Sequence, residues 1–198
     1  MIRKMFGLLL ALCVFVVAGC AKPPAGGPPL ASQGDINKLT AAITALGDQV
    51  DPEEARRAAE IAMLYPNQLA KQYGITDHPL IHNTKVNKGL RPRGLCWHWA
   101  QDMQTRLAQE NFKTLALHRA IANSDSWIFI EHSTVIISQI GDSQDQGIVL
   151  DPWRNGGVLY WAPTLKDEKY TWIARDQVFA KKRKLLLRKR VTVARGKG

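Results

Sequence analysis

The order of the periodic segments constrains the fold of this 198-residue chain more than any other feature. Helical patterns come first, over residues 35–46, from Asp51 to Tyr73, and from Cys96 onward. Strand patterns then follow almost without interruption. Helices followed by consecutive strands predict an α+β domain, with N-terminal helices packed on an antiparallel sheet.

The second helical segment has clear end signals. Asp51 is a typical N-cap, and Pro52 suits the first turn of a helix. Pro66 predicts a break or a kink, and Gly74 a stop. Residues 74–95 contain scattered Gly, Pro and Asn, so we expect them to be irregular.

The strand patterns lie in the second half of the chain. They cover residues 115–122, 127–140, 147–150, 158–161 and 185–193. The segment 127–140 is rich in apolar residues up to Ile137, as expected for a central strand covered on both faces. Pro152 is expected to end the third strand.

The N-terminus has the pattern of an export signal. Arg3 and Lys4 precede an apolar run that ends in Val17-Ala18-Gly19-Cys20. This ending resembles the lipobox of bacterial lipoproteins, in which the cysteine becomes lipidated and N-terminal after cleavage. The resemblance implies a signal peptide over 1–19 and a lipid anchor on Cys20. An ordinary signal peptide or an uncleaved anchor is the alternative.

The Pro/Gly-rich residues 20–34 then read as a tether, and 35–198 as one domain. Ala21 follows the lipobox cysteine, where an aspartate often retains lipoproteins in the inner membrane. The resemblance therefore implies the periplasmic face of the outer membrane, if the host has two membranes.

The net charge of +10 comes from the C-terminal segment. Residues 181–198 carry nine Lys or Arg and no acid, whereas residues 20–180 carry 16 basic and 17 acidic residues. This segment suits an anionic lipid or another polyanion. The alternative, which we favour slightly, is an edge strand whose lysines discourage pairing. Export makes nucleic acid an improbable partner.

Cys96 is the one cysteine expected to keep a free thiol, because Cys13 leaves with the signal peptide and Cys20 is lipidated. It follows Gly94 at the expected start of a helix. His132 lies on one predicted strand and Asp151 on the next. A cysteine, a histidine and an aspartate are the parts of a thiol nucleophile with an oriented base.

This order resembles the transglutaminase-like group of papain-fold cysteine enzymes, over roughly residues 90–160. The resemblance implies that Cys96 is the nucleophile, His132 the general base and Asp151 the group that orients the imidazole. The motifs around these residues also resemble a set of uncharacterised bacterial lipoproteins, which adds no activity.

Strand pairing offers a test of the trio. If Ser138 pairs with Asp145 across a six-residue loop, His132 and Asp151 become direct cross-strand neighbours. This register depends on the loop length that is chosen.

The sequence also offers a candidate for the second donor of an oxyanion hole. The family commonly uses an upstream tryptophan or glutamine, and here Asn83 is the nearest upstream amide. Asn83 is therefore the candidate donor, or equally an Asx-turn residue. His98, two residues after Cys96, is expected to be structural.

Two further questions concern ligands. A zinc site built from Cys96, His98, His132 and Asp151 lacks the usual ligand spacing, so no metal and no cofactor are expected. Arg154 is expected to pair either with an acidic substrate group or with Glu131.

Two functions remain open. The first is an envelope-anchored thiol hydrolase or acyltransferase that acts on peptide or isopeptide amides of a protein or peptide substrate. The second is a non-catalytic lipoprotein that uses the same fold as a binding or assembly module.

Overall fold

The computed structural model describes the backbone of residues 27–195 and the side chains of residues 27–188. The helices are α2 (Gln33–Thr44), α3 (Pro52–Tyr73), α4 (Pro79–Asn87), α5 (Cys96–Ala108) and α6 (Arg175–Arg195). The strands are β1 (Leu115–Ala122), β2 (His132–Gln139), β3 (Ile148–Asn155), β4 (Val158–Pro163) and β5 (Ile173–Ala174). They form an antiparallel five-stranded sheet in the order β4-β3-β2-β1-β5. The α+β class and the antiparallel sheet are confirmed.

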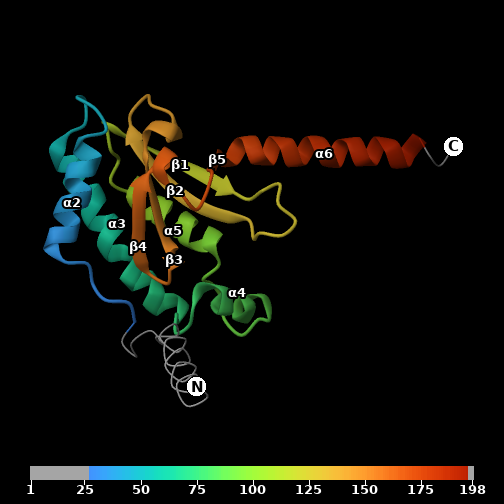
Figure 1. Ribbon diagram of the computed structural model, residues 1–198, viewed down its shortest axis with the longest axis horizontal. Helices are drawn as coiled ribbons and strands as arrows, with labels where there is room; N and C mark the ends of the chain where they lie inside the picture. Colours follow the sequence, from blue (N-terminus) through green and yellow to red (C-terminus); the bar gives the residue numbers. More distant parts are fainter. Residues whose placement is uncertain (1–26, 196–198) are drawn as a thin grey trace, which may run out of the picture.

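The two faces of the sheet are covered differently. Helices α2, α3 and α5 pack on one face, and α6 extends away from the body (Figure 1). The main core joins these helices to alternate residues of the strands, among them Leu39, Ile43, Ala58, Met103, Val135, Ile137 and Leu150. The opposite face carries a smaller cluster around Ile136, Val149 and Trp172. Because side chains alternate along a strand, His132 and Asp151 lie on this second face.

The ends of α3 follow the signals in its sequence. The Asp51 carboxylate accepts from the amides of Glu53 and Glu54 at 2.8 and 2.9 Å. The helix continues through Pro66 and stops at Gly74, which has a left-handed φ of 63°. Before α2, the carbonyl of Pro28 accepts from the Asn67 side chain and Pro28 is buried. The chain therefore packs on the domain before residue 35.

The prediction that residues 74–95 are irregular was wrong for residues 79–87, which form α4. His78 is the N-cap, with Nδ1 accepting from the Leu80 amide, and Pro79 occupies the first turn. The buried residues of α4 are Pro79, His82 and Asn83. This helix has too little apolar periodicity to be found by pattern.

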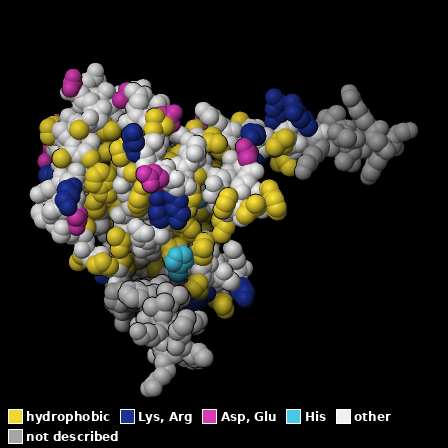
Figure 2. Space-filling view, in the orientation of Figure 1, with side chains coloured by type: hydrophobic (Ala, Val, Ile, Leu, Met, Phe, Trp, Pro, Cys, Tyr) yellow, Lys and Arg dark blue, Asp and Glu magenta, His cyan; other side chains and the backbone are white. Residues whose placement is uncertain are grey.

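The predicted strand 127–140 was wrong at its start, because β2 begins only at His132. Ser126 Oγ accepts from the amides of Ile128 and Phe129, and the Asn123 side chain donates to the Ile130 carbonyl. These local bonds compete with strand pairing. We call residues 127–130 the apolar loop; its four large side chains are exposed, Trp127 by 92%. Figure 2 shows hydrophobic side chains on this projection beneath the basic start of α6.

The predicted strand 185–193 was also wrong, because these residues belong to α6. Leu, Lys and Arg are good helix formers, so local propensity favours the helix. The outer side of β1 is instead occupied by the short strand β5. Leu185, Leu186 and Leu187 are exposed on α6 and do not cover the core.

Candidate active site

The loop before α5 is built to hold Cys96 at the first position of a helix. Gly94 has a φ of 123°, and a Cβ there would collide with the His82 ring. His82 Nε2 lies 2.9 Å from the Arg93 carbonyl, and Trp99 Nε1 donates to the Gly94 carbonyl at 3.0 Å. Only glycine suits this backbone and this close approach. The first amides of a helix lack intrahelical acceptors, so the Cys96 N–H is available to a ligand.

His98 supports the same turn. Its Nδ1 accepts from the amides of Gly94 and Leu95 at 3.2 and 3.1 Å. Burial, followed by the charge of Arg93, lowers the pKa of His98 and keeps the ring neutral, as an acceptor must be. This bonding agrees with the structural role expected for His98.

His132 and Asp151 form a buried pair. His132 Nε2 lies 2.6 Å from Asp151 Oδ2, and the two side chains are 2% and 1% exposed. The other ring nitrogen, Nδ1, is buried and has no hydrogen-bond partner in the part of the chain that the structure describes. The imidazole is therefore held from one side and open for proton exchange on the other.

The Cys96 thiol lies close to this ring without a formed hydrogen bond to it. Burial works against the imidazolium, but the charge and hydrogen bond of Asp151, together with Cys96, raise the pKa of His132 to about 9. The thiol itself donates to the Glu131 carbonyl at 3.6 Å. Catalytic contacts of this kind often tighten only when substrate binds.

The predicted register between the two strands was wrong by two residues. Val135 pairs with Leu150 and Ile137 with Ile148, so the extended register places Asp151 opposite Thr134. The connection between β2 and β3 is longer than six residues because it includes the 3-10 helix η1 (Gln144–Gln146). Because side chains alternate between the two faces of the sheet, a register shift of two residues keeps both side chains on one face. His132 and Asp151 therefore meet as diagonal neighbours. Strand β3 also runs past Pro152, with an irregularity between Asp151 and Asn155.

Arg154 binds the Asp151 carboxylate of the His132–Asp151 pair. Its Nε donates to Asp151 Oδ2 at 3.0 Å, and its other nitrogens bind both oxygens of Asp167 at 3.0 and 2.6 Å. The Glu131 carboxylate pairs with Lys182 instead. The expected Arg154–Glu131 pair is thus wrong, and Arg154 is already engaged by two carboxylates. Arg154 is a positioning residue that limits how Asp151 can turn.

Aromatic rings surround His132. Trp153, Tyr170 and Trp172 have ring centroids 4.6, 4.7 and 5.4 Å from the imidazole. Trp172 Nε1 donates to Asp167, which ties this wall to Arg154. Tyr170 and Trp172 reach the site through the turn before β5, which no local pattern indicates.

Asn83 does not contact the thiol. Its Oδ1 accepts from Trp153 Nε1 at 3.2 Å, on α4 rather than in a loop. Asn83 therefore contacts Trp153, and Trp153 in turn contacts the imidazole. Of the two candidate oxyanion donors, Asn83 and the Cys96 amide, the helix geometry therefore supports the Cys96 amide.

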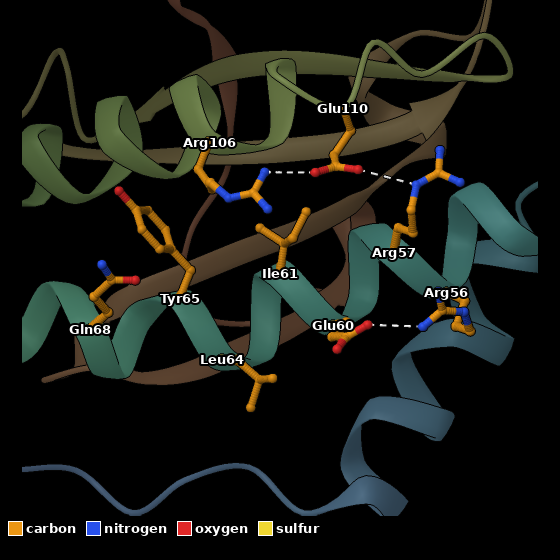
Figure 3. A pocket seen from close by; sticks show the side chains of 9 residues that line it. All are labelled: Arg56, Arg57, Glu60, Ile61, Leu64, Tyr65, Gln68, Arg106 and Glu110. Carbon is orange, nitrogen blue, oxygen red and sulfur yellow. Dashed lines mark hydrogen bonds and ion pairs between the residues drawn. The ribbon is translucent and has the colours of Figure 1, made fainter.

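Three hollows in the described surface are candidates for the site. One of about 490 Å³ is lined by His132, Trp153, Tyr170 and the apolar loop. A second, of about 290 Å³, is lined by Cys96 on α5, by β1 and by α6. A third, of about 400 Å³, lies between α3 and α5. In Figure 3 its charged groups pair with one another, Arg106 and Arg57 with Glu110 and Arg56 with Glu60. The first two hollows meet the reactive residues.

The raised pKa of His132 predicts a pH-dependent stability. A base whose pKa rises on folding stabilises the protein fully below its ordinary pKa of 6.5, and this contribution is lost as the pH rises toward 9. We expect the free energy of unfolding, measured in urea, to fall across this window by up to about 1.4 kcal/mol per pH unit. In His132→Gln this slope should disappear. An equal slope in both proteins would contradict the assigned pair.

Comparison with known proteins adds no identification: no protein-family model, curated protein or solved structure matches the chain. Within residues 27–195, no helix is long and apolar enough to cross a membrane. The predicted signal peptide 1–19 and the lipidated Cys20 lie outside the described residues.

Proposed function

We propose that this protein is a thiol hydrolase or acyltransferase with a transglutaminase-like, papain-type fold, acting on peptide or isopeptide amides. One observation carries the proposal. Asp151 holds one nitrogen of a buried imidazole, while the other nitrogen has no hydrogen-bond partner among the described residues, and the same ring interacts with a cysteine at a helix N-terminus. This is the relative placement that a thiol nucleophile, its base and its orienting group require.

The proposed reaction has two halves, acylation of Cys96 and its deacylation, and His132 transfers protons in both. The Cys96 proton passes to His132 Nδ1, and the thiolate attacks the amide carbonyl carbon. The oxyanion binds at the Cys96 amide, where the helix dipole favours negative charge. The imidazolium then protonates the leaving amine as the C–N bond breaks. Water or a second amine, deprotonated by His132, releases the acyl group and restores the thiol.

The hollow at His132 suggests where one side of the substrate lies. Pro79, Leu80, Ile128, Phe129 and Ile130 line it together with Trp153 and Tyr170. Such a surface favours apolar side chains over charged ones. We therefore assign this hollow to an apolar portion of a peptide or protein substrate.

Thiol alkylation tests the proposal without a known substrate. An imidazolium beside the sulfur favours the thiolate, which is the form that reacts. At about pH 5.5, Cys96 should react with iodoacetamide roughly tenfold faster in the wild-type protein than in His132→Ala. The reaction is followed on the Cys96 peptide by mass spectrometry, so Cys13 and Cys20 do not interfere.

His118→Ala is the matched control for this experiment. His118 lies on β1, where its ring is 2.8 Å from the Ser138 hydroxyl. Its removal should leave the alkylation rate of Cys96 unchanged. Equal rates in the wild-type protein and His132→Ala would make Cys96 an ordinary thiol and contradict the proposal.

A non-catalytic binding module remains the second candidate, and one observation favours it. Cys96 is only 7% exposed, and its thiol is bonded to the Glu131 carbonyl rather than to His132. A buried, inert cysteine has such a contact. In that case the hollow at His132 binds a partner peptide, and the function of the protein depends neither on the Cys96 thiol nor on the His132 imidazole.

We further propose that the protein is a lipoprotein of the cell envelope, anchored through Cys20, on the periplasmic face of the outer membrane in a two-membrane host. Helix α6 supports a contact with anionic lipid, since residues 181–188 carry five Lys or Arg and no acid. Lys181 pairs with Asp125 at 2.6 Å, which ties α6 to the loop that carries Trp127 and Phe129. Cationic and apolar side chains together suit a lipid surface.

Deleting residues 181–198 tests this contact. In a Cys20→Ser background, the deletion should weaken cosedimentation with anionic vesicles by tenfold or more, since each basic residue near such a surface contributes about 1 kcal/mol. Added salt should mimic the deletion. The melting temperature should change little, because Leu185, Leu186 and Leu187 are exposed. Unchanged vesicle binding would contradict the lipid contact.

A further inference from the structure

Arg119 is a cation that lines the same hollow as Cys96 and has no partner among the described residues. It projects from β1 into the hollow of about 290 Å³ that Cys96 also lines. Its Nε is buried and has no hydrogen-bond partner, and its guanidinium makes no ion pair within the described residues. Burial, then the charge of Arg175, lowers the pKa of Arg119 to about 10, and only Cys96 acts in the opposite direction. Such a desolvated charge is unfavourable unless an anion binds to it.

The other partly buried arginines of the domain are different. Four of them have a carboxylate partner: Arg57 and Arg106 bind Glu110, Arg93 binds Asp102, and Arg154 binds Asp167. Arg91, whose Nε is also buried without a partner, has no carboxylate among the described residues, but its Nη1 donates to the Leu90 carbonyl at 3.3 Å. Arg119 has neither kind of partner within the described part of the chain, and it lies at the cysteine.

Arg175 adds a second cation to the same hollow. It stands at the start of α6, and its guanidinium lies 4.3 Å from the centre of the Phe179 ring. It too makes no ion pair within the described part of the chain. Glu131 also lines the hollow, but Lys182 neutralises its carboxylate. The hollow is several times larger than the ~30 Å³ that one water occupies, so it can hold a small anionic group.

We propose that Arg119 and Arg175 bind a carboxylate of the substrate beside Cys96, so that the amides this protein processes carry a carboxylate next to the scissile bond. The proposal rests on the proposed function, which it deepens by naming the substrate class. Two guanidinium groups offer several N–H donors to the two oxygens of a carboxylate. The apolar hollow at His132 would then receive the other side of the substrate.

Two alkylating reagents of nearly equal size test this binding. Iodoacetate carries a carboxylate and iodoacetamide a neutral amide; in both, sulfur displaces iodide from the same carbon. The measured quantity is the ratio of their rate constants at Cys96, divided by the ratio for N-acetylcysteine amide. Both reagents need the thiolate, so the amount of thiolate cancels. We expect a normalised ratio on the order of ten in the wild-type protein.

Variants then assign the effect. Arg119→Gln and Arg175→Gln should each lower the ratio toward one, and Arg119→Lys should keep part of it. Arg183→Gln, on the exposed side of α6, removes the same charge and should leave the ratio unchanged. A wild-type ratio near one, or an equal loss in Arg183→Gln, would overturn the proposal. If Arg119→Gln slows both reagents equally, Arg119 is a counterion of the thiolate and the carboxylate site is also excluded.

Protection experiments distinguish the two sources of a carboxylate. N-acetyl-Ala-Ala offers a C-terminal carboxylate, N-acetyl-Ala-Glu-amide a side-chain carboxylate, and N-acetyl-Ala-Ala-amide none. Protection of Cys96 from iodoacetamide by either acid, and not by the amide, supports the site and identifies its source. Protection by none, with a wild-type ratio near one, overturns it. Failure of the proposed function would show separately, as an iodoacetamide rate that does not depend on His132.

Discussion

Cys96→Ala should abolish the proposed turnover, because Cys96 is the nucleophile that forms the acyl intermediate in the proposed reaction. The loss should exceed a thousandfold in the hydrolysis of a peptide-amide library by the purified protein. In cells, the variant should fail to complement the envelope phenotype of a deletion strain. The fold should survive, since removal of one buried sulfur costs about 1 kcal/mol.

Cys96→Ser is the matched control for this change. Serine keeps a donor for the Glu131 carbonyl and nearly the volume of the thiol, so it separates packing from nucleophilicity. Both variants should be inactive and folded, as judged by circular dichroism and melting temperature. Full rescue by Cys96→Ser and Cys96→Ala would rule out catalysis and leave the binding module as the function.

Asp151→Asn should lower the rate by a hundredfold or more without removing the nucleophile. Asparagine can still contact His132 Nε2, but it cannot stabilise the imidazolium and favours the wrong tautomer. The pKa of His132 should fall from its raised value, so less imidazolium faces the sulfur and the pH profile of Cys96 alkylation should shift to higher pH. The rate and this profile are measured together on one preparation.

Stability should fall in the same variant, because Asp151 also accepts from Arg154. Loss of a charged acceptor from a buried network costs about 1–3 kcal/mol. Asp167→Asn is the control, since it weakens the other side of Arg154 without touching His132. It should cost comparable stability and much less rate. Equal rate losses in the two variants would show that Asp151 acts only through the fold.

The sequence could predict what depends on local chemistry. Asp51 as a cap and Gly74 as a stop mark the ends of α3 because a few neighbouring atoms satisfy the exposed backbone groups. Strand β1 has the predicted bounds 115–122 because its pattern is not disturbed by side-chain bonds. Cys96, His132 and Asp151 could be singled out because their residue types limit the chemistry that they support.

Sequence could not predict what depends on contacts between distant segments. The β2–β3 register depended on the length of a loop, and the apolar loop departs from the sheet through side-chain bonds from Asn123 and Ser126. Helix α6 stands where a strand was expected; local propensity favours the helix, and β5 occupies the edge of β1 where such a strand would have paired.

By itself, then, the sequence determined the α+β class, the main helix ends and the three residues on which the proposed chemistry depends. Only the tertiary structure decided what surrounds them. Arg154 stands behind Asp151 and Arg119 beside Cys96 because strands β3 and β1 bring them there. A charged residue in a sequence does not reveal its partner. Burial and pairing decide what that charge does, and both are properties of the packed chain.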